Sequence, residues 1–169
     1  MKKTLLIALL FIGSFAQAQQ EVKVDLLDAL ALKTVEVSYE YYTTERSSVG
    51  LSTLINFEKK SKDFRYNENW MITPYFRHYF TDNSNWNYFG EVFMGINGGE
   101  KDKKVETAGV VENIEEKYTD GALGLAIGSK YVSSGGFVLD VYAGLGRNMF
   151  TSKSPVVVPR VGINLGYRF

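Results

Sequence analysis

Val161 to Phe169 reads VGINLGYRF. Every odd-numbered position in this stretch holds an apolar side chain, and every even-numbered position holds glycine, asparagine or arginine. Successive side chains of a β-strand point to opposite faces of the sheet. The stretch therefore predicts a strand with one apolar face and one polar face.

The same alternation recurs upstream. A less regular apolar pattern over residues 21–28 predicts one more strand, joined to the next by a tight turn near residues 29–33. Single-chain bacterial barrels have even numbers of strands, which favours a total of eight. The other six segments with two unlike faces are 34–42, 49–57, 70–80, 88–97, 123–131 and 137–146.

The expected connections alternate in length. Short turns are expected near residues 44–47, 81–85 and 132–135, and longer polar loops near 58–68, 98–118 and 148–155. Long loops on one side of a sheet and short turns on the other are typical of outer-membrane barrels. Strands of roughly 9–12 residues can cross a bilayer when tilted. The pattern predicts an all-β fold, an eight-stranded antiparallel up-and-down transmembrane β-barrel.

Two features indicate that the apolar face points outward to lipid, although a soluble lipocalin-like barrel would show the same alternation. Glycines such as Gly124, Gly128 and Gly144 lie on the polar face, which suits a narrow interior where large and small side chains interleave. Aromatic residues collect at one end of the strands, as in the girdle at a membrane interface. They are Tyr39, Tyr41, Phe80, Trp86, Tyr88, Tyr131, Phe137, Tyr167 and Phe169.

The first residues indicate export. Lys2 and Lys3 precede an apolar run at residues 5–12 and an Ala-Gln-Ala site at residues 16–18, so we expect a signal peptide over 1–18 and a barrel domain over 19–169. Without the two lysines, 17 basic residues remain of 19 against 19 acidic ones, which gives no reason to expect nucleic acid as a partner. The chain has no cysteine, so no disulfide stabilises it.

Eight charged residues fall on the polar, inward face. Buried charges need partners of opposite sign, so we expect them to form a structural network that fills the barrel, with Arg160 set apart from the lower group. A narrow ion path through rearranging pairs is the alternative. The residues are Glu36, Glu40, Glu91 and Asp140 against Arg77, Lys130, Arg160 and Arg168.

Candidate catalytic and metal-binding residues are scarce. His78, the one histidine, falls on the lipid-facing side, with no serine at a meaningful spacing along the chain. The sequence holds no Gly-x-Ser-x-Gly motif and no His/Cys cluster, so we expect no enzyme activity, no metal and no cofactor.

Three segments resemble a known group of proteins. VEVSYEYYTTERSSVGLSTLINF (residues 35–57), ITPYFRHYF (72–80) and VGINLGYRF (161–169) are similar to small, mostly uncharacterised outer-membrane barrels of Bacteroidota, which are of the OmpA/OmpX type. The resemblance includes Tyr39-Glu40 and Ser48-Val49-Gly50, and covers most of the chain beyond residue 18. Tyr75 departs from it, at a position where a charged or small inward residue is expected.

The resemblance implies a cell outer-membrane location with both termini periplasmic. It also implies that Tyr167 and Phe169 form a C-terminal signal for the barrel assembly machinery. The function expected is a non-enzymatic structural, envelope-integrity or surface-interaction role for a monomer surrounded by outer-membrane lipid. An extracellular ligand would bind through loops 58–68 and 98–118. A narrow pore and a lipid-modifying enzyme are the alternatives.

Overall fold

The computed structural model describes residues 19–27, 34–57, 68–81, 85–107 and 110–169, with side chains left undescribed over 101–115. The expected signal peptide, the turn near residues 29–33, residues 58–67 of the expected loop at 58–68 and residues 82–84 of the expected turn at 81–85 lie outside these ranges. Eight strands make up the fold: β1 (Gln20–Asp25), β2 (Thr34–Thr44), β3 (Ser47–Asn56), β4 (Glu68–Tyr79), β5 (Trp86–Thr107), β6 (Val110–Val132), β7 (Phe137–Asn148) and β8 (Val157–Arg168).

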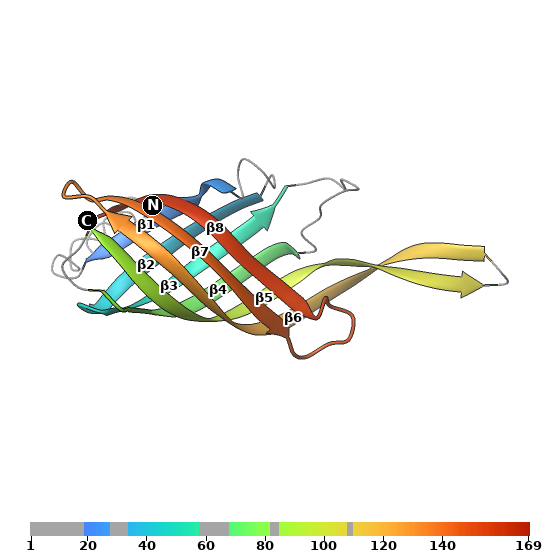
Figure 1. Cartoon of the computed structure of the whole chain (residues 1–169). Coiled ribbons are helices and arrows are strands. Elements are labelled where there is room, and N and C mark those ends of the chain that lie inside the picture. Colours follow the sequence, from blue (N-terminus) through green and yellow to red (C-terminus); the bar gives the residue numbers. More distant parts are fainter. Residues whose placement is uncertain (1–18, 28–33, 58–67, 82–84, 108–109) are drawn as a thin grey trace, which may run out of the picture.

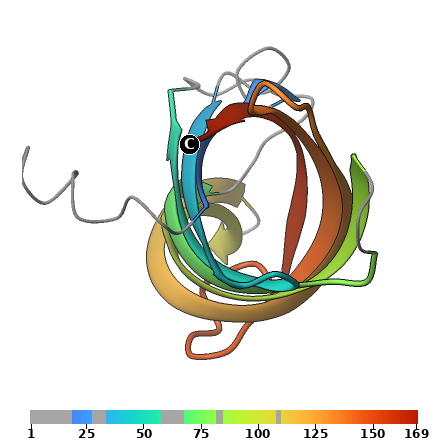
Figure 2. The same ribbon diagram turned by 90° about the vertical axis from the view of Figure 1, so that its left-hand side faces the viewer.

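The strands close into a barrel in sequence order (Figures 1 and 2). Each strand is antiparallel to the next, and β1 closes the ring against β8, with Val22 opposite Tyr167 and Asp25 opposite Asn164. This confirms the predicted eight-stranded antiparallel up-and-down barrel. Among the described residues, no helix is long and apolar enough to span a membrane.

The predicted division into two faces holds along the strands. In β4, burial alternates along almost the whole strand, so that Arg77 and Tyr79 are buried inside and Phe76 and His78 are exposed outside. The exposed face is apolar and the buried face carries polar and charged groups. The molecule is thus arranged as expected for a barrel in lipid, the reverse of a soluble protein.

The first strand is shorter than expected. We predicted a strand over residues 21–28, but β1 ends at Asp25 and a helical turn follows at Leu26 and Leu27. The carboxylate of Asp25 accepts a hydrogen bond from the Leu27 backbone N–H at 2.8 Å. An aspartate that bonds the backbone two residues on favours a turn over a continued strand.

The prediction of a loop over residues 98–118 is wrong. Strands β5 and β6 continue through it as a ribbon, paired from Gly98 opposite Thr119 to Thr107 opposite Val110. Figure 1 shows this ribbon extending beyond the barrel, at the end away from the start of β1 and the C-terminus. High polarity suggested a loop, but a two-stranded ribbon in water is polar on both faces and gives no apolar alternation.

The short turns lie at the other end of the barrel. Thr44 ends β2 and Ser47 begins β3, and residues 133–136 connect β6 to β7. Gly136 has a φ of 86°, a left-handed conformation that glycine adopts without strain. At the far end, residues 149–156 join β7 to β8, close to the expected loop at 148–155.

Candidate functional site

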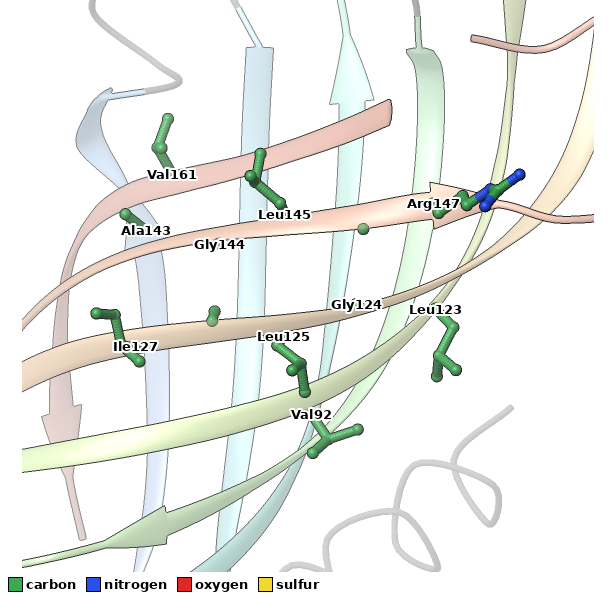
Figure 3. A pocket seen from close by; sticks show the side chains of 12 residues that line it. Val92, Leu123, Gly124, Leu125, Ile127, Ala143, Gly144, Leu145, Arg147 and Val161 are labelled. Atoms are coloured by element: carbon green, nitrogen blue, oxygen red, sulfur yellow. The ribbon is translucent and has the colours of Figure 1, made fainter. Parts of the chain in front are cut away.

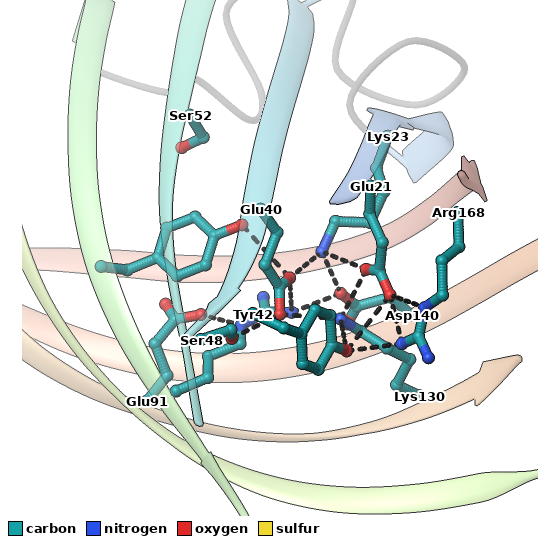
Figure 4. Close-up of polar contacts among 12 residues, drawn as sticks. Glu21, Lys23, Glu40, Tyr42, Ser48, Ser52, Glu91, Lys130, Asp140 and Arg168 are labelled. Carbon is teal, nitrogen blue, oxygen red and sulfur yellow. Dashed lines mark hydrogen bonds and ion pairs between the residues drawn. The ribbon is translucent and has the colours of Figure 1, made fainter. Parts of the chain in front are cut away.

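Glu40 of β2 occupies the middle of a buried charge network inside the barrel (Figure 4). Its side chain is 0% exposed, and both carboxylate oxygens have donors. Because a buried carboxylate needs cations and hydrogen-bond donors around it, these contacts hold Glu40 in one position. Its partners are Ser48 Oγ at 2.6 Å, Tyr79 OH at 2.5 Å, Tyr75 OH at 3.4 Å, Arg77 Nη1 at 3.2 Å, Lys130 Nζ at 2.9 Å and Lys23 Nζ.

Arg77 of β4 links three strands across the lumen. Its Nε donates to Glu91 of β5 at 2.6 Å, and its Nη1 donates to Asp140 of β7 at 2.5 Å. The guanidinium also lies 4.1 Å from the ring centre of Phe89, on the same wall as Glu91. A planar guanidinium can meet several carboxylates and an aromatic face at once, which lysine cannot do.

Two lysines complete this layer. Lys23 of β1 lies 2.9 Å from Asp140 Oδ2, and Lys130 of β6 lies 2.7 Å from Glu21 Oε2. Lys130 also donates to Tyr79 OH at 2.5 Å. Both lysines are fully buried, so each ammonium exchanges water for carboxylates contributed by other strands.

The network continues toward both ends of the barrel. Near the chain termini, Arg168 Nη2 lies 2.5 Å from Glu21 Oε1 and donates to Tyr42 OH at 2.6 Å. On the other side, Arg160 Nη2 lies 3.2 Å from Glu36 Oε1. Arg160 Nη1 lies 3.5 Å from Glu91 Oε1, which links the two layers.

The structure brings all eight predicted inward charges into one network and places Arg160 apart from the lower group. Sequence reasoning missed Glu21 and Lys23, although Glu21-Val-Lys-Val-Asp25 shows the same alternation as the later strands. Among the described residues the network has five acids and five bases. They are Glu21, Glu36, Glu40, Glu91 and Asp140, and Lys23, Arg77, Lys130, Arg160 and Arg168.

Aromatic rings fill the space between the charges. Tyr75, the unexpected inward tyrosine, lies directly opposite Gly50 in the β3–β4 pair, and a Cβ added at Gly50 would overlap its ring. Phe93 packs over Gly124 in the same way. A large residue on one strand therefore occupies the place of a missing side chain on another.

Asp120 lies at the barrel mouth away from the termini. It comes before the outward apolar run that starts at Leu123, so it is outside the membrane-spanning part of β6. Burial by itself raises the pKa of Asp120. Hydrogen bonds from the Ser154 hydroxyl and from backbone N–H groups together lower the pKa by more than burial raises it, so the net shift is downward. Three of these donors belong to the β7–β8 connection: Ser154 Oγ at 2.5 Å, Phe150 N at 2.8 Å and Thr151 N at 3.2 Å. The fourth is the N–H of Gly121 in β6, at 2.7 Å.

His78 lies beside a serine of the neighbouring strand, which was not expected from the sequence. Its Nδ1 lies 3.2 Å from Ser47 Oγ, because Ser47 of β3 stands opposite His78 of β4. Spacing along the chain could not show this cross-strand pair. The imidazole is exposed on the outer face and packs edge-on against Phe80, with ring centres 5.6 Å apart.

No group of three or more His, Cys, Asp or Glu side chains placed to hold a metal ion occurs in the described part of the chain. The predicted assembly-signal residues Tyr167 and Phe169 both lie exposed on the outer face at the end of β8.

Comparison with known proteins agrees with this architecture. A family model described as "Protein of unknown function (DUF3575)" matches residues 4–154. No curated protein matches the chain.

Solved structures of membrane barrels resemble the fold. The N-terminal β-barrel domain of Pseudomonas aeruginosa OprF is 12% identical, with a TM-score of 0.57 over 90% of this chain and 96% of that one. Neisserial surface protein A is 15% identical, with a TM-score of 0.50 over 89% and 92%. The Yersinia pestis outer membrane protein Ail, in a phospholipid bilayer nanodisc, is 14% identical, with a TM-score of 0.50 over 90% and 100%. At these identities the likeness concerns the fold.

Proposed function

The chain belongs to the DUF3575 family of proteins of unknown function, and we propose that it is a small outer-membrane β-barrel with a structural, envelope-integrity or surface-interaction role. In this proposal residues 1–18 are removed during export, both termini face the periplasm, and the barrel is a monomer. Its β5–β6 ribbon then extends from the cell surface.

The filled interior carries the proposal. Arg77, Lys23 and Lys130 cross the lumen with at most 1% of each side chain exposed, and Phe89 and Phe93 are equally buried. An eight-stranded barrel is just wide enough for side chains to fill it. Because paired charges and aromatic rings occupy the lumen, the structure favours a closed barrel and not a channel for solutes.

The outer surface supports a location in lipid. Large apolar side chains cover the outward positions of the strands, including Val37, Leu51, Phe76, Leu125 and Ile127. Soluble monomers rarely expose contiguous apolar patches larger than a few hundred Å². Lipid is the solvent that suits such a surface.

The proposed location in the outer membrane also indicates the partners of the protein. Tyr167 and Phe169, exposed at the end of β8, would be read by the barrel assembly machinery. An extracellular ligand would meet the β5–β6 ribbon and the segment 58–68. A source among Bacteroidota is part of this proposal and rests on the sequence resemblance.

Orientation and location can be tested together, because the chain has no cysteine. Ser134 lies exposed in the β6–β7 turn and Ser152 lies exposed in the β7–β8 connection. We expect S152C to react with a membrane-impermeant maleimide on intact cells, and S134C to react after the outer membrane is permeabilised. Both variants should fractionate with the outer membrane and show heat-modifiable gel mobility.

Labelling of S134C but not S152C on intact cells would reverse the orientation. Recovery of both variants as soluble periplasmic protein would refute the membrane location.

We also propose that the protein is not an enzyme, although the Ser47–His78 pair favours a lipid-modifying activity as the second candidate. S47A and H78A should leave the lipid profile of cells unchanged, measured by mass spectrometry against wild type and a deletion strain. A lipid product that disappears in both variants and in the deletion strain would support the enzyme.

A further inference from the structure

A groove of about 980 Å³ runs along the outer face of the barrel over β6 and β7 (Figure 3). Leu125 and Ile127 of β6 and Leu145 of β7 project beside it, and each is 65–72% exposed. Ala143, an outward residue with only a methyl group, lies among them. The groove thus exists because the small side chain of Ala143 leaves space between the longer leucine and isoleucine side chains around it.

Arg147 lies at one end of this groove. It continues the outward positions of β7 beyond Leu145 and is exposed. Its neighbours across the two strand pairs are Leu123 and Val157, both apolar. Within the described residues, its guanidinium makes no hydrogen bond or ion pair, whereas the cations inside the barrel are all paired.

The depth of Arg147 along the barrel points to a headgroup. Arg147 is next to the last residue of β7, at the end away from the chain termini. Met149 and Phe150 follow it, and Phe150 is 81% exposed. Aromatic side chains and long cationic ones gather where hydrocarbon meets polar headgroups.

We propose that the groove binds an acyl chain of a phosphorylated glycolipid of the outer leaflet, and that Arg147 binds the phosphate of that lipid. The inference rests on the proposed function, because the orientation proposed there puts Arg147 in the outer leaflet. An unpaired guanidinium matches a phosphate with two parallel hydrogen bonds. Apolar contact alone discriminates little between lipid chains, so the phosphate contact supplies the selectivity.

Native mass spectrometry of the folded barrel in detergent tests the proposal. The probes are a diphosphorylated lipid A and, for comparison, phosphatidylglycerol. Wild type should retain lipid A in preference to phosphatidylglycerol. R147Q should bind lipid A about tenfold more weakly, as expected for the loss of one charged contact. R147K should lie between the two, because lysine keeps the charge and loses the paired geometry.

A second variant tests the groove itself. A143F places a ring in the groove and should reduce retention of lipid A while leaving Arg147 intact. The matched control is V37F, which adds the same ring on the outward face of β2. R46Q removes an exposed cation in the β2–β3 turn. Both controls should bind lipid A as wild type does.

Equal retention of lipid A by wild type and R147Q would overturn the proposal, and so would a preference for phosphatidylglycerol. Pairing of two copies through the groove, seen as a dimer that A143F abolishes, would also contradict it. Heat-modifiable mobility is measured on every sample. A wild-type barrel with normal mobility that retains no lipid A therefore counts against the groove, whereas a wild-type chain that forms no barrel counts against the proposed function.

Discussion

At the scale of single residues, Glu40 shows why the interior is one unit. Its carboxylate joins cations from β1, β4 and β6 and hydroxyl groups from β3 and β4. Removing one member of a buried group of ion pairs leaves its former partners as buried charges without a counter-charge. The resulting loss of folding stability is larger than the net stability that the intact group contributes. The strands are therefore coupled through side chains as well as through backbone pairing.

Replacing Glu40 with glutamine tests this coupling. E40Q should lower the free energy of unfolding by about 3–5 kcal/mol, since Lys23, Lys130 and Arg77 stay buried with one carboxylate fewer. Urea unfolding of the barrel in lipid vesicles measures the change. The control is E45Q in the exposed β2–β3 turn, which should stay within about 0.5 kcal/mol of wild type. An E40Q barrel as stable as the control would refute the coupling.

Gly50 tests the packing of rings against glycines. G50L should destabilise the barrel by at least about 1–3 kcal/mol, because its side chain would occupy the space of the Tyr75 ring. G135A is the control, since a Cβ there meets no atom closer than Ser133 Oγ at 4.0 Å. Thermal shifts of heat-modifiable mobility report both. Equal stability of the two variants would show that Tyr75 can move aside without cost.

The sequence predicts whether a side chain points inward or outward, because this depends on the alternation within one strand. Contacts that depend on the register between two strands were missed. Alternation alone placed Glu40 and Arg77 inside and Phe76 outside. Lys23 was missed because the alternation of this segment covers only residues 21–25 and breaks at Leu26 and Leu27, so the segment was not treated as a source of inward charge. The Ser47–His78 pair depends on the register of two strands, which sequence spacing does not give.

At the scale of elements, the β5–β6 ribbon separates from the barrel. Beyond Gly99, which pairs with Tyr118, the ribbon continues without a neighbouring strand among the described residues. An isolated two-stranded hairpin is at best marginally stable in water. The ribbon should therefore contribute little to barrel stability and should be free for surface contacts.

Shortening the ribbon tests its independence. Residues 102–115 are replaced by Asn-Gly, which joins Lys101 to its pairing partner Glu116 by a two-residue turn. The shortened chain should keep heat-modifiable mobility and a urea midpoint close to that of wild type. A chain that no longer folds would show that the barrel depends on the ribbon.

The β7–β8 connection should respond to acid through Asp120. The pKa of Asp120 is lowered in the folded protein, so its contribution is complete above the ordinary value of 3.8 and is lost as pH falls through the lower folded value. The amide NMR signals of Phe150 and Thr151, whose N–H groups bond this carboxylate, should shift together below pH 3.8. D120N should abolish that transition, and a transition that persists in D120N would assign it elsewhere.

At the scale of the whole molecule, strand number and closure were predicted from seven segments with a two-residue period and a less regular eighth, which the even strand count of bacterial barrels favours. The period could not show the extent of the ribbon, because strands that leave the membrane lose the apolar alternation. It also could not show that the charges of β1 join those of β4 and β7, since these meet only when β1 closes against β8.

We infer that paired charges and rings close the lumen of a membrane-spanning barrel. Planar-bilayer recording of the folded wild-type protein, with insertion verified by heat-modifiable mobility, tests it most directly. We expect no conductance above background for wild type. Stable open-channel steps from the inserted wild-type protein would contradict the claim.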